Sequence, residues 1–328
     1  MKKVLGIGNA LVDVMTPLDD DSIIEQLGFA KGSMNLVDED KSRVIKELTS
    51  KHISNMASGG SAANTIHGIS KMRATGGFIG AIGADTTGEI FEKNMKSAGV
   101  KTYLSIKDDD TGTAVAMISK DSERTFATHL GAAEKLVADD LDKSIFSRYD
   151  YLYLEGYLIT NMDLVKKACK YAREEGLKIA IDLSSFNVVE EFKDNFSQII
   201  DDYVDIIFAN QFEAKALTGL EAEEAIKVMA KRSDIAVIKT GKEGSIVQEG
   251  KEMIKIDAMD VDCIDTTGAG DLYAAGFLFG LANDAPLDKC GYFGTLLASH
   301  VIQVIGPKID IDKWHMLREK VHEKLEEN

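Results

Sequence analysis

The residues with the clearest chemical potential lie between Asp265 and Phe277, in the order Asp-Thr-Thr-Gly-Ala-Gly-Asp-Leu-Tyr-Ala-Ala-Gly-Phe. Polar and glycine residues give way there to an apolar run, which predicts a helix that begins near Gly268. Unpaired amides at a helix N-terminus bind anions, and small residues let the backbone approach a phosphate closely. Gly268, Ala269 and Gly270 are therefore candidates for a phosphate-binding turn.

Asp271 is the unusual residue of this motif, because a bound phosphate repels a neighbouring carboxylate. A carboxylate at such a position can serve as the base that deprotonates an incoming hydroxyl. It can equally stabilise the first turn of the helix, where acidic side chains interact favourably with the helix dipole. The motif alone leaves both interpretations open.

A second glycine turn that opens into a helix spans Ser58 to Thr65. Gly59 and Gly60 predict a close approach of the backbone to a ligand, and the Asn64 amide offers a donor and an acceptor to a hydroxyl. Small residues needed for helix packing explain the same motif. The Gly-Gly-Ser-Ala-Ala order lacks the final glycine of a nucleophile elbow, which disfavours a serine hydrolase.

The end of the first predicted strand carries two further polar candidates, Asn9 and Asp13. Their side chains can hydrogen-bond to vicinal hydroxyls of a ligand, although a plain turn would contain the same residue types. Gly6 and Gly8 resemble the start of a dinucleotide fingerprint, but Leu11 stands at the position of its third glycine. This disfavours a nicotinamide-dependent oxidoreductase.

Two more polar stretches follow strand-like runs. Asn210 and Glu213 share one side of a first helical turn and could orient water around Mg²⁺, although an N-cap by Asn210 explains them more simply. The other stretch offers candidates for nucleotide binding, and a hairpin turn would look alike. Its candidate residues are Lys239, Thr240, Gly241 and Gly244.

The composition narrows the class of protein. The chain has 328 residues, 45% of them hydrophobic, and a formal net charge of −16. This charge argues against binding to nucleic acid or to an anionic membrane. The three cysteines, Cys169, Cys263 and Cys290, form no metal-binding spacing, and the first residues leave no room for a signal peptide. We expect a cytoplasmic protein that acts on a small molecule.

Strand-like apolar runs alternate with helical patterns, which predicts an α/β fold with a mostly parallel sheet flanked by helices. The runs cover residues 4–8, 77–82, 150–154, 178–182, 204–208 and 235–239. Ligands bind beyond the carboxyl ends of such strands, where Asp182, Asn210 and Thr240 follow. An amphipathic helix is expected from Asp310 onward.

The first half is less regular, with short strand-like segments that interrupt the α/β pattern. We expect them to form a small β-sheet lid built from about residues 11–18, 32–38 and 101–128, within a single domain spanning residues 1–328. Such a lid can cap one subunit or pair with that of a neighbour, so the chain is expected to be a monomer or a homodimer.

Taken together, these motifs resemble those of the ribokinase-like (phosphofructokinase-B) family of carbohydrate and nucleoside kinases. Gly59 to Asn64 resembles the family's first signature, Asp265 to Asp271 its second, and Asn210 to Glu213 its N-x-x-E motif. The similarity runs from Gly6 to about Pro307. Within the family it is greatest to the adenosine kinase branch, through Gly8–Asp13, Thr111–Ala114, Arg124–Ala133, Glu155–Tyr157 and Tyr203–Ile206.

The resemblance implies a role for each matched residue. Asp13 and Asn9 would hold ribose hydroxyls, and Gly60 and Asn64 would line the same pocket beside Gly59. Asp271 would be the base, and the amides of Gly268, Ala269 and Gly270 would form the anion hole. The resemblance also places Arg124 of the lid on the transferring phosphate, and a monovalent cation such as K⁺ beside Asp265 and Thr267.

The expected activity is transfer of the ATP γ-phosphate, with Mg²⁺, to a primary hydroxyl of a nucleoside, adenosine foremost. No matched residue requires a purine, so a sugar kinase acting on ribose, fructose or 2-keto-3-deoxygluconate is the alternative within the family. A non-catalytic nucleoside- or sugar-binding protein is the alternative from another class.

Overall fold

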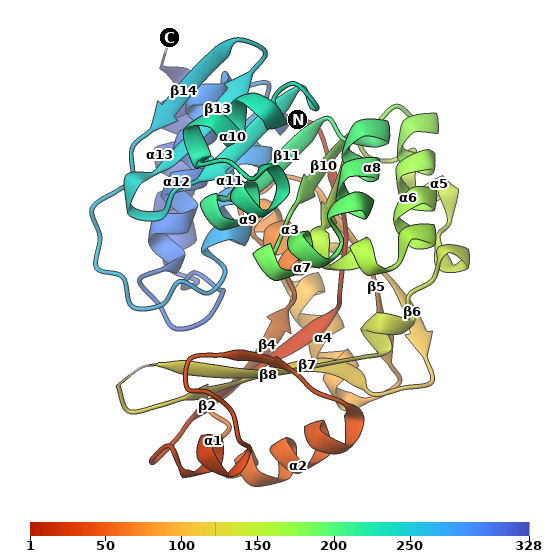
Figure 1. The fold of residues 1–328 in the computed structure, drawn as a ribbon, viewed down its shortest axis with the longest axis vertical. Coiled ribbons are helices and arrows are strands. Elements are labelled where there is room, and N and C mark those ends of the chain that lie inside the picture. The colour runs from red at the N-terminus through yellow and green to blue at the C-terminus, as the bar shows by residue number, and fades with distance from the viewer. Residues whose placement is uncertain (122, 328) are drawn as a thin grey trace.

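The computed structural model describes residues 1–121 and 123–327, and its centre is a nine-stranded sheet (Figure 1). The seven strands from β12 to β6 are parallel, and β13 and β14 join antiparallel at one edge. In order, the strands are β14 (Glu252–Ile256), β13 (Ser245–Glu249), β12 (Ile235–Lys239), β11 (Ile206–Asn210), β10 (Lys178–Asp182), β9 (Tyr151–Glu155), β1 (Val4–Ile7), β5 (Gly76–Gly83) and β6 (Lys101–Lys107). The prediction of a mostly parallel sheet is confirmed.

Helices cover both faces of this sheet, because successive strand residues alternate between two buried clusters. Tyr151 and Tyr153 belong to one cluster, whereas Leu152 and Leu154 belong to the other. The first face packs against α3 (Ser61–Lys71), α4 (Thr86–Ser97), α11 (Ala269–Ala282), α12 (Leu287–Val301) and α13 (Lys313–Glu326). The second packs against α5 (Lys143–Phe146), α6 (Met162–Glu174), α7 (Phe186–Glu191), α8 (Lys193–Tyr203), α9 (Gln211–Thr218) and α10 (Ala222–Met229).

A five-stranded second sheet, which we call the lid, projects from this α/β body (Figure 1). Its strands are, in order, β3 (Met34–Leu36), β8 (Arg124–Gly131), β7 (Thr111–Ile118), β2 (Leu11–Pro17) and β4 (Asn55–Gly59), and α1 (Ser22–Gln26) and α2 (Glu39–Thr49) accompany them. The chain enters the lid from β1 through residues 8–10 and returns from β4 to α3 through Gly60. The glycine-rich motifs of the first half therefore lie where the lid joins the body.

The predicted boundaries of the lid need one correction. Residues 101–107 form β6, which pairs in parallel with β5 at the edge of the large sheet, and they are not part of the lid. An edge strand is covered less fully than a central one, so β6 has a mixed polar pattern like that of a lid strand. The lid also contains β4, which was not predicted, and Ser122 of the predicted segment lies outside the described residues.

No helix within the described ranges is long and apolar enough to cross a membrane.

Gly60 shows why this junction requires glycine. Its φ of +92° belongs to a region that side chains rarely adopt, and an added Cβ would collide with the carbonyl oxygen of Asn9. Gly99 provides a matched comparison, because its φ is +88° but a Cβ there would meet nothing within 4 Å.

We expect Gly60→Ala to lower the free energy of unfolding by at least about 3 kcal/mol, because backbone strain and a backbone collision add. Gly99→Ala should cost about 1 kcal/mol, since it carries the strain alone. Urea unfolding of both variants measures the difference. Equal losses in the two variants would contradict a close approach at Gly60.

Candidate active site

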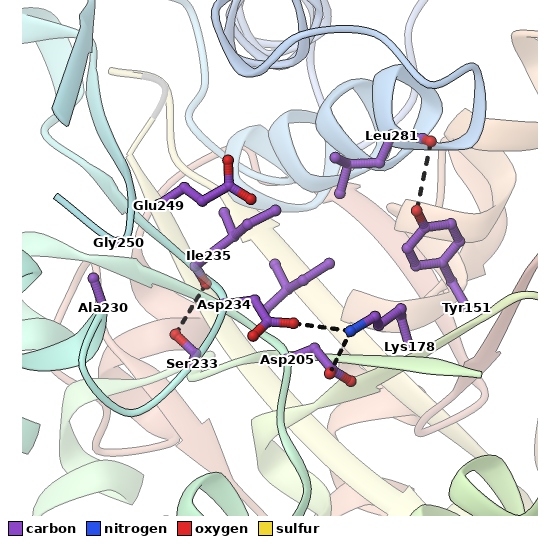
Figure 2. Close-up of a pocket in the computed structure, with 11 residues that line it drawn as sticks. Tyr151, Lys178, Asp205, Ala230, Ser233, Asp234, Ile235, Glu249, Gly250 and Leu281 are labelled. Carbon is purple, nitrogen blue, oxygen red and sulfur yellow. Dashed lines mark hydrogen bonds and ion pairs between the residues drawn. The ribbon is translucent and has the colours of Figure 1, made fainter. Parts of the chain in front are cut away.

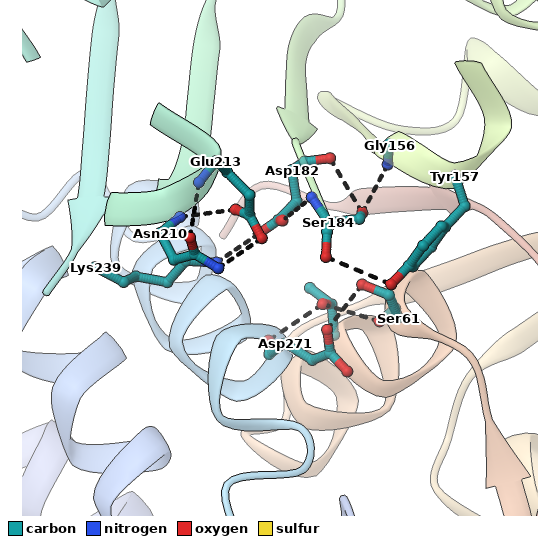
Figure 3. A network of polar contacts seen from close by, with 10 residues as sticks. Ser61, Gly156, Tyr157, Asp182, Ser184, Asn210, Glu213, Lys239 and Asp271 are labelled. Carbon is teal, nitrogen blue, oxygen red and sulfur yellow. Dashed lines mark hydrogen bonds and ion pairs between the residues drawn. The ribbon is translucent and has the colours of Figure 1, made fainter. Parts of the chain in front are cut away.

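Polar side chains from both sheets and from the helices α3, α9 and α11 gather at the carboxyl ends of β9, β10, β11 and β12. Figure 3 shows part of this network, with Asp182, Asn210 and Glu213 on one side and Ser61 and Asp271 on the other. The N-termini of α3 and α11 both reach this place. The predicted motifs therefore lie together at the carboxyl ends of the strands, where the site was expected.

Asp271 lies in the first turn of α11 and is held by two residues of α3. Ser61 Oγ donates to its Oδ1 at 2.7 Å, and Asn64 Nδ2 donates to its Oδ2 at 3.0 Å. Burial raises the pKa of Asp271 to about 6, while these two hydrogen bonds lower it. The carboxylate is thus fixed in place, mostly ionised at neutral pH, and basic enough to take a proton.

The N-terminus of α11 presents the backbone amides expected of an anion site. Gly268 is the N-cap with a φ of +77°, and the amides of Gly268, Gly270 and Asp271 have no acceptor among the described residues. The amide of Ala269 differs from the expectation, since it donates to the Thr266 carbonyl at 3.1 Å. The backbone turn that precedes the helix uses this amide, so in this structure the Ala269 amide is not available to the predicted anion hole.

Lys239 lies beside this helix terminus. An added Cβ on Gly270 would lie 3.1 Å from Lys239 Nζ, and this ammonium donates to Asp182 Oδ2 at 2.8 Å (Figure 3). Burial lowers the pKa of Lys239, but the attraction of Asp182 and Glu213 outweighs it and raises that pKa above its usual value. A permanent cation therefore stands next to the free amides.

Asn210 and Glu213 form a capping box at the start of α9, as the simpler interpretation of the motif predicted. Asn210 Oδ1 accepts from the amides of Phe212 and Glu213, and the Glu213 carboxylate accepts from the Asn210 amide at 2.7 Å and Nδ2 at 2.7 Å. Burial, and then the charge of Asp182, raises the pKa of Glu213 to about 7. No group of three or more His, Cys, Asp or Glu side chains in the described part could hold a metal directly.

The stretch from Lys239 to Gly244 is the connection of a hairpin between antiparallel β12 and β13, as its alternative interpretation predicted. The Thr240 amide donates to the Gly244 carbonyl at 2.8 Å, and the Gly244 amide donates to the Gly241 carbonyl at 3.0 Å. Thr240, Gly241 and Gly244 thus lie at the same sheet edge as Lys239, and their role in nucleotide binding stays a prediction.

Asp13 faces the site from β2 of the lid. Its carboxylate is 8% exposed, lies against Gly59, and accepts no hydrogen bond from any residue that the structure describes. Burial raises the pKa of Asp13 to about 7, although the charge of Lys308 lowers it. The residue is buried but its carboxylate oxygens keep some exposure, so they can accept hydrogen bonds from ligand hydroxyls.

Asn9 was expected to bind a ligand hydroxyl, but its side chain is already hydrogen-bonded to Glu155. Its Nδ2 donates to Glu155 Oε1 at 2.7 Å, and its amide donates to the same oxygen at 2.9 Å. Glu155 Oε2 accepts from the Ala62 amide at 2.9 Å, so this one carboxylate ties the end of β1 to the start of α3. Burial raises the pKa of Glu155 to about 7 against these hydrogen bonds.

Arg124, at the start of β8, is paired with Asp265. Its guanidinium donates to Asp265 Oδ2, with a longer contact of 3.3 Å to Thr267 Oγ1. The Asp265 carboxylate also accepts from the Thr267 amide at 3.0 Å, the Thr267 hydroxyl at 2.8 Å and the Gly306 amide at 2.8 Å. Four donors thus surround Asp265, an arrangement that does not fit a monovalent cation at Asp265 and Thr267. Arg124 reaches the phosphate position only if it leaves this carboxylate.

Several residues of the site were not among the predicted ones. Ser61 was noted for a possible hydrolase motif, Asp182 for its position at a strand end, and Glu155 within a stretch that resembles adenosine kinases, but no role was assigned to them. Lys308 donates to Asn64 Oδ1 at 2.8 Å from the segment between α12 and α13. A single lysine in an irregular segment has no sequence signal that would reveal this contact.

A second hollow, of about 480 Å³, lies at the opposite edge of the sheet, beside the amino ends of the strands (Figure 2). Tyr151 and Lys178 line it together with Asp205, Asp234 and Glu249, and Lys178 Nζ binds Asp205 at 3.1 Å and Asp234 at 2.9 Å. Its carboxylates outnumber its cation, which disfavours phosphate there. The motif residues all lie at the other edge.

A parallel sheet with a β lid at its carboxyl edge, and a helix terminus with free amides beside a carboxylate, is an arrangement suited to a kinase for small hydroxyl compounds. The profile of the pfkB family of carbohydrate kinases matches residues 33–314, so the chain belongs to this family. It is a phosphotransferase with an alcohol group as acceptor, which disfavours the oxidoreductase and the non-catalytic binding protein.

Individual relatives agree with this assignment. An adenosine kinase from Sinorhizobium meliloti is 33% identical, with a TM-score of 0.87 over 97% of this chain and 99% of that one. A probable sugar kinase from Rhizobium etli is 30% identical, with a TM-score of 0.89 over 98% of both chains. An adenosine kinase from Saccharomyces cerevisiae is 28% identical over 94% of this chain and 96% of its own length. The chain is thus similar to the adenosine kinase branch.

The buried carboxyls predict an unusual dependence of stability on pH. The folded-state pKa values of Asp13, Glu155 and Glu213 are about 7, and that of Asp271 is about 6. Unfolded carboxyls titrate near pH 4, so the folded protein binds more protons between pH 4 and 7, and its stability falls as the pH rises through that window. His67 and His300 oppose this trend, because their lowered pKa values mean that they bind fewer protons in the folded state than in the unfolded state.

We expect the melting temperature of the ligand-free protein to be about 2–4 °C higher at pH 6 than at pH 8. Glu155→Gln should lower the melting temperature at both pH values and narrow the difference, because one titrating group is lost. Differential scanning calorimetry measures both. A wild-type protein that melts higher at pH 8 would contradict the raised pKa values.

The Arg124–Asp265 pair predicts independence from potassium. Replacing KCl by choline chloride at equal ionic strength should change kcat less than about twofold, because hydrogen-bond donors already surround Asp265. An activation of tenfold or more by K⁺ over choline would show that a cation displaces Arg124 during turnover.

Proposed function

We propose that this kinase transfers the γ-phosphate of ATP to a primary hydroxyl of a nucleoside, adenosine foremost. The observation that carries the acceptor side is Asp13, a buried carboxylate without a protein donor in the same site as Asp271. Two adjacent ribose hydroxyls would supply the missing donors. Asn64, Gly59 and Gly60 lie around this position, and Asn9 acts through Glu155 to hold it.

Asp271 is the proposed base. Its carboxylate takes the proton of the acceptor hydroxyl as the oxygen attacks the γ-phosphorus, the new P–O bond forms, and the bond to the β-phosphate oxygen breaks to release ADP. The hydrogen bonds from Ser61 and Asn64 keep the carboxylate in one orientation, so that little reorganisation is needed when the proton moves. The lid would exclude the water that competes as acceptor.

The free amides of Gly268, Gly270 and Asp271 would bind the oxygens of the transferring phosphate, and Lys239 would add a positive charge beside them. Thr240, Gly241 and Gly244 would contact the nucleotide further out. Arg124 would join the phosphate after exchanging Asp265 for it, since both are anions.

Mg²⁺ would be held through water by Asn210 and Glu213, with Asp182 nearby. The convergence of carboxylates there fits such a site, because Mg²⁺ in phosphate sites keeps several waters and needs no complete protein cage. When bound, the ion would neutralise charge on the phosphate chain of ATP.

A sugar kinase is the second candidate within the family. The acceptor residues identified above bind hydroxyls, and none of them requires a purine. The similarity to the probable sugar kinase from Rhizobium etli favours keeping this candidate. Ribose, fructose and 2-keto-3-deoxygluconate are the acceptors that would distinguish it.

The decisive experiment is ADP release from Mg-ATP against a panel of nucleosides and these sugars. Turnover with adenosine or another nucleoside supports the proposal. Turnover confined to a free sugar would overturn the nucleoside assignment and keep the phosphotransfer mechanism.

Asp271→Asn should lower kcat with the best acceptor by roughly 10²–10⁴-fold, because the amide cannot accept the proton. Asp288→Asn, which changes an acid in the first turn of α12, serves as the matched control and should keep near wild-type turnover. Circular dichroism would establish that both variants fold. A kcat of Asp271→Asn within threefold of wild type would rule out Asp271 as the base.

A further inference from the structure

Lys308 enters the site from a segment that is fixed on two sides. The amide of Gly306, two residues earlier, donates to Asp265 Oδ2 at 2.8 Å. Pro307 lies against Gly268, where an added Cβ would come within 2.7 Å of the proline ring. The segment is thereby tied to the α11 terminus, and Lys308 Nζ reaches Asn64 Oδ1 at 2.8 Å. The position of this ammonium is therefore built into the fold.

The ammonium lies between two carboxylates without touching either. Asp13 and Asp271 both attract Lys308 electrostatically, yet among residues 1–121 and 123–327 no carboxylate oxygen lies within 4.0 Å of its Nζ. One of its three N–H donors is used by Asn64, and Asp13 has no donor at all within the described chain. The charge of Lys308 thus acts on both carboxylates without a direct contact.

The contacts of Asn64 show how Lys308 acts on Asp271. An ammonium can only donate, and an ionised carboxylate can only accept. The Asn64 carbonyl oxygen must therefore face Lys308 and its NH₂ group must face Asp271, which matches the distances of 2.8 Å and 3.0 Å. A neutral residue without a donor at position 308 would leave the Asn64 carbonyl oxygen without its partner, so that only the hydrogen bond to Asp271 would orient the amide.

We propose that Lys308 is a positioning residue for phosphoryl transfer: it fixes the Asn64 amide that holds Asp271 and supplies the positive charge that lets Asp13 and Asp271 be ionised together beside the acceptor. The inference rests on the proposed role of Asp271 as the base. It adds a residue between α12 and α13 to a site otherwise built from α3, α11, the strand ends and the lid.

This proposal has a signature in the pH profile. Burial lowers the pKa of Lys308 to about 8, although Asp13 and Asp271 raise it. The other charged or titratable groups near it are on α3, where Lys71 lowers its pKa further and buried His67 is kept neutral by a strongly lowered pKa. Loss of the Lys308 proton would therefore limit activity on the alkaline side, and protonation of Asp271, with a pKa of about 6, on the acid side.

The test is kcat and kcat/KM for the acceptor between pH 5 and pH 10 for wild type, Lys308→Met and Lys308→Arg. The kcat/KM profile reports the free enzyme, so for wild type it should show a bell with limbs near pH 6 and 8, and the limbs discussed below are those of this profile. Lys308→Met should lose about 10–100-fold in kcat at pH 7, with its acid limb moved toward neutral pH because a carboxylate without its cation is harder to ionise. The KM for ATP should change less than about threefold, since Lys239 faces the nucleotide side.

Lys308→Arg keeps the charge and the donor, so it should retain at least about a third of the wild-type kcat while its alkaline limb moves above pH 9. Lys313→Met, which removes an exposed lysine at the start of α13, should match wild type throughout. Thermal unfolding checks that each variant folds.

Two results would overturn the proposal. The first is a Lys308→Met enzyme with wild-type kcat and pH limbs, and the second is a Lys308→Arg enzyme whose alkaline limb stays near pH 8. If Lys308→Met fails to fold, the arginine variant alone decides. Wild type without acceptor-dependent turnover, or a fully active Asp271→Asn, would instead remove the proposed function and this inference with it, so the two failures are distinguishable.

Discussion

Five carboxylates converge where the lid joins the α/β body. Four of them are at most 8% exposed: Asp13, Glu155, Asp182 and Glu213. The fifth, Asp271, is held within the first turn of α11. Buried like charges oppose folding, because each carboxylate loses hydration and repels the others. The raised pKa values of four of them are the direct consequence. Much of the local structure can be understood as the means by which this cluster is kept together.

Three devices compensate the repulsion, and each carries a different part of the site. Glu155 accepts hydrogen bonds from two backbone amides and from the Asn9 side chain, which stabilise its carboxylate and join β1 to α3. Asp182 and Glu213 share Lys239 beside the α11 terminus, and the charge of Lys239 also acts on Asp271. Lys308 acts on Asp13 and Asp271 from the other side. In the proposed function, Lys239 would lie toward the phosphate donor and Lys308 toward the acceptor, with Asp271 between them.

Sequence reasoning predicted the parts of the fold that depend on local pattern. The strands at 178–182 and 235–239 match β10 and β12 because parallel strands buried on both faces are continuously apolar. β6 was assigned to the lid because a short edge strand has no pattern that identifies its sheet. The antiparallel β13 and β14 went unrecognised because they follow β12 as consecutive hairpin strands, with no helix between them, and so fall outside the alternating strand–helix pattern.

The site was predictable where chemistry depends on a glycine turn, and less so where it depends on long-range pairing. The order of glycines and polar residues indicated Gly60, Gly268 and Asp271, because positive φ angles and helix termini leave a local signature. The Arg124–Asp265 pair joins residues 141 positions apart, and the Lys308–Asn64 contact joins residues 244 apart. Such pairs are fixed by the three-dimensional path of the chain, and one sequence contains no trace of them.

An overall charge of −16 and an anionic substrate are compatible in this molecule, because nearby groups affect the proposed phosphate position far more than the average charge of the protein does. Amides without acceptors at the α11 terminus and the Lys239 ammonium are within a few ångströms of it, whereas most acidic groups are on exposed helix faces where solvent screens them. The exceptions are the buried carboxylates of the site itself. Lys239 and Lys308 each offset part of the negative charge of the carboxylates beside them, and under the proposed function this helps to keep Asp271 available to accept a proton.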